Sequence, residues 1–116
     1  MSAGKDEELV NLLFEIGIKR NVAKVLVFLA KTPMSYRAIV RDTGLRRHEV
    51  VMVMQYLKKR GWIKNLENKA KSRGRPVKIY GLAKPITEIM NAIEKEKVKE
   101  ANDQLQIIQK LRNYIS

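Results

Sequence analysis

Residues 41–67, "RDTGLRRHEVVMVMQYLKKRGWIKNLE", contain the pattern that decides the fold of this chain. Within "LRRHEVVMVMQYLKKRG" (45–61), apolar residues recur at the spacing of one helical face, at Leu45, Val50, Met54 and Leu57. Gly44 favours a tight turn before this helix, and Gly61 favours its end. The stretch therefore predicts a turn followed directly by a helix with one buried face.

Two strands are predicted after this helix. "WIKNLE" (62–67) and "VKIYGL" (77–82) alternate apolar and polar residues with a period of two, as half-buried strands do. The tip between them is basic and contains Gly74 and Pro76. These features predict a β-hairpin with a positively charged tip.

Helical patterns also precede the turn. The apolar spacing predicts one helix over residues 6–16 and a second over about 20–31, which Thr32-Pro33 ends. Ser35 is a suitable N-cap for a third, shorter helix that Gly44 closes. From Pro85 onward a last helix of about 30 residues is expected, reaching roughly 45 Å.

This order of elements is that of a winged helix-turn-helix. Residues 12–33, "LLFEIGIKRNVAKVLVFLAKTP", together with residues 34–85, which contain "TGL", "YLKKRGWI" and "GRPVKIYGL", resemble prokaryotic winged-helix transcription regulators. The likeness covers roughly residues 9–85 and is greatest to the DNA-binding part of archaeal TrmB-type and MarR-like regulators. We expect a mainly α fold with a small β-hairpin wing: a winged-helix DNA-binding domain at 1–84 and a C-terminal dimerisation helix at 85–116.

Charge is concentrated in the middle of the chain. The net charge is +12, and residues 37–78 hold thirteen Lys or Arg against three acidic residues, net +10. Such segregation inside a folded domain is typical of a face that binds a polyanion. The alternative is a lysine-rich surface that is simply solvated.

Composition argues against several other classes. The chain has no cysteine and only one histidine, His48, so we expect no metal and no cofactor. The twelve acidic residues are scattered, which gives no clustered carboxylates or nucleophile–base pair for an enzyme. No apolar run approaches the roughly 20 residues of a membrane span, and no secretion signal begins the chain, so a cytoplasmic protein is expected.

The outward face of the helix over 45–61 supplies the predicted base-reading residues. They are Arg46, Arg47, His48, Val51, Met52, Gln55 and Lys58. Arg47 and Gln55 are the leading candidates, because Arg offers a fork to guanine and Gln a donor–acceptor pair to adenine. Val51 or Met52 could touch a thymine methyl group, or could instead pack under the wing or against a neighbouring helix.

Other basic residues are predicted to contact DNA outside the major groove. Phosphate contacts are expected at Arg37, Lys59, Arg60 and Lys64, although cations near a helix C-terminus also stabilise the helix dipole. The wing candidates are Lys69, Lys71, Arg73, Gly74, Arg75 and Lys78. "RGRP" (73–76) also resembles the AT-hook, which lays arginines along a narrow A·T minor groove. A solvated turn is the alternative.

The last helix carries a second apolar stripe that a projecting helix cannot bury alone. We predict a homodimer through residues of this stripe and of the first helix: Leu9, Leu12, Leu13, Val98, Ala101, Leu105, Ile108, Leu111 and Ile115. Folding back onto the chain's own first helix is the alternative.

Together these features predict sequence-dependent binding of double-stranded DNA by a dimeric transcription regulator, a repressor or a local architectural factor. The competing hypotheses are a winged helix that binds structured RNA and one that docks proteins.

Overall fold

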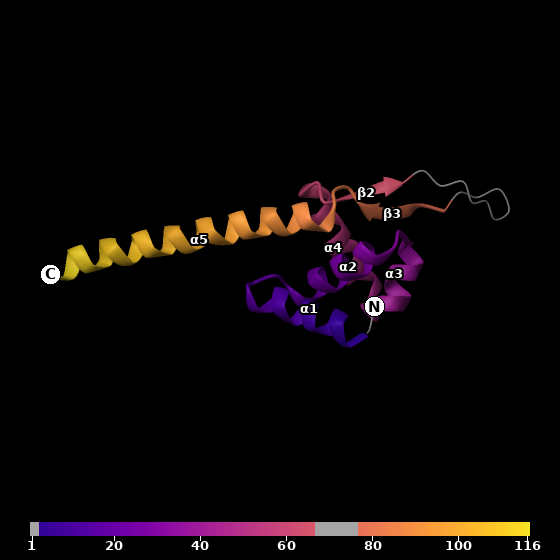
Figure 1. Ribbon diagram of the computed structural model, residues 1–116, viewed down its shortest axis with the longest axis horizontal. Helices are drawn as coiled ribbons and strands as arrows, with labels where there is room; N and C mark the ends of the chain where they lie inside the picture. Colours follow the sequence, from indigo (N-terminus) through magenta and orange to yellow (C-terminus); the bar gives the residue numbers. More distant parts are fainter. Residues whose placement is uncertain (1–2, 67–76) are drawn as a thin grey trace. The chain divides into compact units, whose positions relative to one another are not determined.

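The computed structural model describes residues 3–66 and 77–116, and the chain divides into two compact units, Met1–Pro85 and Ile86–Ser116 (Figure 1). The first unit contains, in order, α1 (Ala3–Glu15), α2 (Arg20–Lys31), β1 (Met34–Ser35), α3 (Tyr36–Thr43), α4 (Arg47–Lys59), β2 (Ile63–Leu66) and β3 (Ile79–Leu82). The second unit is one helix, α5 (Ile86–Ile115). The predicted fold class is confirmed: mainly helical, with a small wing and a long last helix.

Helix α2 is the centre of the first unit's core. It buries six residues, Val22, Ala23, Val25, Leu26, Val27 and Leu29. Helix α1 lies antiparallel to α2. The Lys31 ammonium, at the end of α2, pairs with Asp6, near the start of α1, at 2.6 Å. At the other end, Arg20 donates a hydrogen bond to Asn11 Oδ1 at 2.8 Å.

The turn between α3 and α4 is built as the sequence predicts. The Ser35 hydroxyl caps α3 by accepting from the Ala38 N–H at 3.2 Å. Gly44 follows α3 with φ of +73°, in the left-handed region that glycine adopts most readily. The Thr43 hydroxyl donates to the Ile39 carbonyl at 2.6 Å and accepts from the Leu45 N–H at 3.3 Å. Thr43 thus ties the end of α3 to the residue before α4.

The sheet has three antiparallel strands in the order β1-β3-β2, one more than the hairpin predicted from the sequence. Met34 pairs with Tyr80 across β1 and β3, and Asn65 pairs with Tyr80 across β2 and β3. Strands β2 and β3 have four residues each, shorter than the expected six. Strand β1 has only two residues, too few for a period to be recognised.

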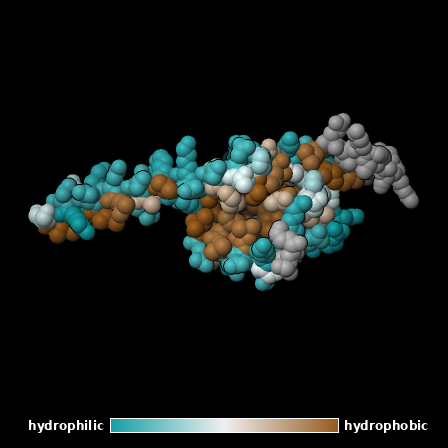
Figure 2. All heavy atoms as spheres, in the orientation of Figure 1, coloured by the Kyte–Doolittle hydropathy of each residue, from teal (hydrophilic) through white to brown (hydrophobic). Residues whose placement is uncertain are grey.

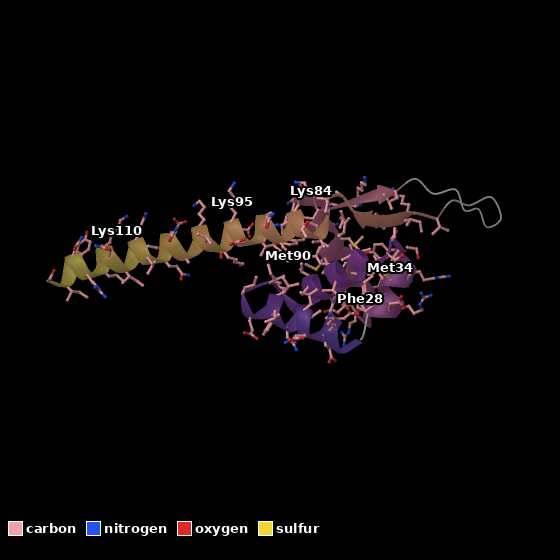
Figure 3. The ribbon with its side chains drawn as sticks, viewed as in Figure 1. Phe28, Met34, Lys84, Met90, Lys95 and Lys110 are labelled. Carbon is pink, nitrogen blue, oxygen red and sulfur yellow. The ribbon has the colours of Figure 1, made fainter. Side chains whose placement is uncertain are left out.

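Helix α5 is continuous over 30 residues. Ile89 and Ile93 are its buried residues, and every residue from Val98 to Ser116 is exposed. Apolar side chains gather along one side of its C-terminal half (Figure 2), while Lys95 and Lys110 project into solvent (Figure 3). Ion pairs Lys97–Glu100 (3.3 Å) and Lys99–Asp103 (2.9 Å) lie along the helix surface.

Among the residues that the structure describes, none of the helices combines the length and the apolar character needed to cross a membrane.

Candidate nucleic-acid interface

Helix α4 has one buried and one exposed face. Its buried face consists of Val50, Val53, Met54 and Leu57, three of which the sequence pattern predicts. All seven predicted base-reading residues are exposed: Arg46, Arg47, His48, Val51, Met52, Gln55 and Lys58. Met52 retains 66% of its surface in solvent, so it does not pack under the described part of the wing. The helix therefore offers a solvent-facing stripe with arginines at its start and an amide and an ammonium, Gln55 and Lys58, toward its end.

The start of α4 differs slightly from the expectation. Arg46 is the N-cap residue and not part of the helix, which begins at Arg47. Glu49, in the first turn, accepts a hydrogen bond from the Arg46 backbone N–H at 3.0 Å. A carboxylate in this place satisfies an N–H that the helix leaves without a partner, and it complements the positive end of the helix dipole. The basic residues Arg46 and Arg47 thus lie at the start of α4.

Lys58 connects the exposed face of α4 to the sheet. Its ammonium lies 5.1 Å from the centroid of the Tyr80 ring in β3. Tyr80 in turn packs edge-on against Tyr36, at the start of α3, with centroids 6.3 Å apart. Aromatic faces attract cations, so this contact orients the Lys58 side chain along the wing side of the helix.

Tyr36 is a member of this cluster that the sequence analysis missed. Its hydroxyl is buried and has no hydrogen-bond partner within residues 3–66 and 77–116. Burial raises the pKa of Tyr36 above its ordinary value, Tyr80 raises that pKa further, and the positive charge of Arg47 opposes both. The Tyr36 ring therefore lies in the electrostatic range of a predicted base-reading arginine.

Arg60 occupies a different environment from the other predicted phosphate contacts. Its guanidinium carbon lies 5.1 Å from the centroid of the Tyr56 ring and 4.6 Å from that of Trp62. Trp62 is buried, and Arg60 itself is only partly exposed. Arg60 therefore packs against the end of α4. The signal in the sequence is the spacing of Tyr56 and Arg60, which lie one helical turn apart.

The other described phosphate candidates, Arg37, Lys59 and Lys64, are exposed, as is Lys78 of the wing. The remaining wing candidates are Lys69, Lys71, Arg73, Gly74 and Arg75, and they lie outside the described residues. Two positive charges close to the turn, Arg37 and Arg41, lie on α3. Arg41 is paired with Asp42 at 2.8 Å, and this hydrogen bond holds the pKa of Asp42 below its usual range.

The predicted dimerisation residues divide into two groups. Seven are large and exposed, namely Leu9, Leu12, Val98, Leu105, Ile108, Leu111 and Ile115, and the small Ala101 is exposed as well. Leu13 is only 3% exposed and belongs to the core, so it offers no surface to a second copy. Four further apolar residues are exposed but were not predicted from the sequence: Ile107 and Tyr114 of α5, Phe14 of α1, and Ile16 just after α1.

No group of three His, Cys, Asp or Glu side chains that could hold a metal ion occurs in the described parts of the chain.

The arrangement of α2, α3 and α4, with a turn before α4 and a three-stranded sheet, is that of the winged helix-turn-helix fold. The chain is similar to the solved transcriptional regulator PA3341, with a TM-score of 0.54 and 22% identity over 85% of this chain and 72% of that one. It is similar to the adhesin competence repressor AdcR from Streptococcus pyogenes, with a TM-score of 0.52 and 17% identity over 91% and 83%.

A third similar structure is the homodimeric winged helix-turn-helix DNA-binding domain Mb0332 from Mycobacterium bovis, with a TM-score of 0.50 and 17% identity over 90% of this chain and 93% of that one. No protein-family model and no curated protein matches the sequence. At these identities the similarity shows the winged-helix fold, and the narrower TrmB-type affiliation is not confirmed.

Proposed function

We propose that this chain is a DNA-binding transcription regulator that inserts α4 into the major groove of double-stranded DNA. The observation that carries the proposal is that all seven predicted residues of the reading face are exposed while the opposite face of α4 is buried. A helix of about this width fits the major groove of B-DNA, and side chains near its start reach base edges. Arg47 and Gln55 remain the proposed base-reading residues.

Affinity would come from charges around α4. Arg37, Lys59 and Lys64 are exposed basic side chains, which supports phosphate contact. Arg60 leaves this set because its guanidinium packs on Tyr56 and Trp62. The proposal for the wing rests on Lys78, which is exposed, and on the sequence of residues 69–75, which is rich in Lys and Arg.

The proposed active form is a homodimer that covers the apolar stripe of α5. Leu105 and Ile108 are 61% and 47% exposed, and most of the stripe around them is apolar. Removing apolar surface from water lowers the free energy by about 25 cal/mol per Å². A second copy that covers this stripe would therefore be stabilised by association. A two-fold dimer presents two α4 helices to a two-fold operator, and a bound dimer that blocks a promoter acts as a repressor.

Selection of bound sequences from a random pool of duplex DNA tests this function. We expect an enriched site with two inverted half-sites about one helical turn apart. A matched selection with the Arg47→Ala and Gln55→Ala double variant should lose the enrichment but keep nonspecific retention. Tight binding without any enriched sequence would contradict a sequence-dependent regulator and indicate an architectural protein.

A further inference from the structure

A pocket of about 540 Å³ opens beside α1 and α2, within the first unit and among residues that the proposed DNA contacts do not use. Its volume is in the range of sites that bind small molecules. Its lining combines acidic groups from α1, basic groups from α2 and an apolar surface. A ligand that carries both charges and an apolar part would match this lining. Phe28, labelled in Figure 3, contributes part of the apolar surface.

The acidic side of the pocket contains an oxygen that lacks a donor. Asp6 Oδ2 accepts from the Lys31 ammonium at 2.6 Å, while Asp6 Oδ1 is buried and has no hydrogen-bond partner in the described part of the chain. Leaving a buried polar atom without a partner costs about 1–3 kcal/mol, and more for a charged group. Glu7 adds a second carboxylate to the same lining. This side of the pocket therefore suits a cationic N–H donor.

The basic side of the pocket offers the opposite charge. Lys24 of α2 lines it, and its ammonium makes no ion pair with the residues that the structure describes. An ammonium in this position suits a carboxylate. The same lining contains the buried Val10 and the partly buried Phe28, which supply its apolar surface.

We propose that this pocket binds a free amino acid with an apolar side chain. Its ammonium would pair with the carboxylates of Asp6 and Glu7, its carboxylate would accept from Lys24, and its side chain would lie on Val10 and Phe28. Thr43, whose hydroxyl ties the end of α3 to Leu45, also lines the pocket. A bound amino acid would therefore contact the residue that holds the turn before α4.

The test is a titration of the ¹⁵N-labelled full chain with L-phenylalanine, followed by amide chemical shifts. We expect saturable shifts at residues of α1 and α2 around the pocket. Phenethylamine, which lacks the carboxylate, and N-acetyl-L-phenylalanine, which lacks the ammonium, should each bind at least about tenfold more weakly because each loses one charged hydrogen bond. The readout uses no DNA, so its result does not depend on the function proposed above.

Lys24→Gln keeps the length of the side chain and should weaken L-phenylalanine about tenfold while leaving phenethylamine unchanged. Lys19→Gln, at an exposed lysine that does not line the pocket, is the matched control and should bind like the parent. The proposal is overturned by any of three results: no saturable shifts with L-phenylalanine, L-leucine or L-tryptophan up to about 10 mM, shifts that map away from the pocket, or equal affinity of Lys24→Gln and the parent.

Discussion

The guanidinium carbon of Arg60 lies 4.6 Å from the centroid of the Trp62 ring. Tyr56 lies on the same guanidinium at 5.1 Å, so Arg60 contacts two aromatic rings at the junction of α4 and β2. A cation over an aromatic face is stabilised by the ring's electron density, and the effect increases as water is excluded. Arg60 therefore stabilises the position of the helix that we propose reads DNA, and it is a poor candidate for a phosphate contact.

Replacing Arg60 by Ala should lower the free energy of unfolding by about 1–2 kcal/mol, because both cation–π contacts and their packing are lost. Urea unfolding followed by circular dichroism at one fixed protein concentration measures this. Lys59→Ala is the matched control: Lys59 is an exposed neighbour, so its loss should change stability by less than about 0.5 kcal/mol while weakening DNA binding. Equal stability of the two variants would show that the aromatic contacts of Arg60 contribute nothing.

Single substitutions on the reading face should change base preference more than overall affinity. Arg47→Ala or Gln55→Ala should cost on the order of 1–3 kcal/mol on the best site, because a bidentate contact to one base is lost. Comparison of affinities for a panel of single-base operator variants measures the change. If both variants rank the panel as the parent does, the reading face of α4 has been assigned to the wrong residues.

Charge placed in the apolar stripe of α5 should produce monomers. Leu105→Lys combined with Ile108→Lys introduces two like charges that must be buried at a two-fold seam, which costs several kcal/mol. Sedimentation equilibrium at micromolar concentration should then give the monomer mass. The control pair Gln106→Lys and Asn113→Lys adds the same charge at polar positions and should remain dimeric. A parent chain that is already monomeric contradicts the proposed dimer.

Tyr36→Phe should leave the fold unchanged and raise the free energy of unfolding by about 1 kcal/mol, because the buried hydroxyl has no partner in the described structure. Tyr114→Phe, at a side chain that is 90% exposed, is the control and should change stability by less than about 0.5 kcal/mol. A clear loss of stability in Tyr36→Phe would show that the hydroxyl makes a bond that stabilises the domain.

Tyr36 also predicts a dependence on alkaline pH. Because its pKa is raised in the folded chain, the unfolded chain loses this proton first as the pH rises. The free energy of unfolding is therefore unaffected by this titration below the ordinary pKa of tyrosine, about 10, and falls as the pH rises from there through the folded-state value. Unfolding measured across this range should therefore show a steeper loss for the parent than for Tyr36→Phe, and parallel curves would contradict the assignment.

The elements that sequence reasoning predicted well depend on local signals. The Ser35 cap, the left-handed Gly44 and the bounds of α2 each follow from residues within a few positions of one another. Strand β1 has no such signal, because Met34 and Ser35 become a strand only by pairing with Tyr80 and Ile79 of β3. Pairing between residues so far apart in the chain cannot be predicted from a two-residue pattern.

In the candidate site, too, features with a local sequence signal were predicted and features that depend on distant residues were not. Which face of α4 is exposed follows from its apolar period, and that prediction agrees with the burial of Val50, Met54 and Leu57. Leu13 was assigned to the dimer seam because an apolar residue has the same period whether it faces its own core or a partner. Arg60 was assigned to phosphate because its charge is visible in the sequence, whereas the convergence of Tyr56 and Trp62 on it is not.

Binding of a fluorescent duplex of about 30 base pairs, titrated across salt concentrations, tests the central claim most directly. We predict saturable binding whose log affinity falls linearly with log salt, with a slope of about −0.9 for each phosphate contacted, and weaker binding to a hairpin RNA of equal length. Lys59→Ala should flatten the slope by about one unit. No saturable binding to duplex DNA at low salt, or tighter binding to the hairpin RNA, would contradict the proposal that this winged helix is a DNA-binding regulator.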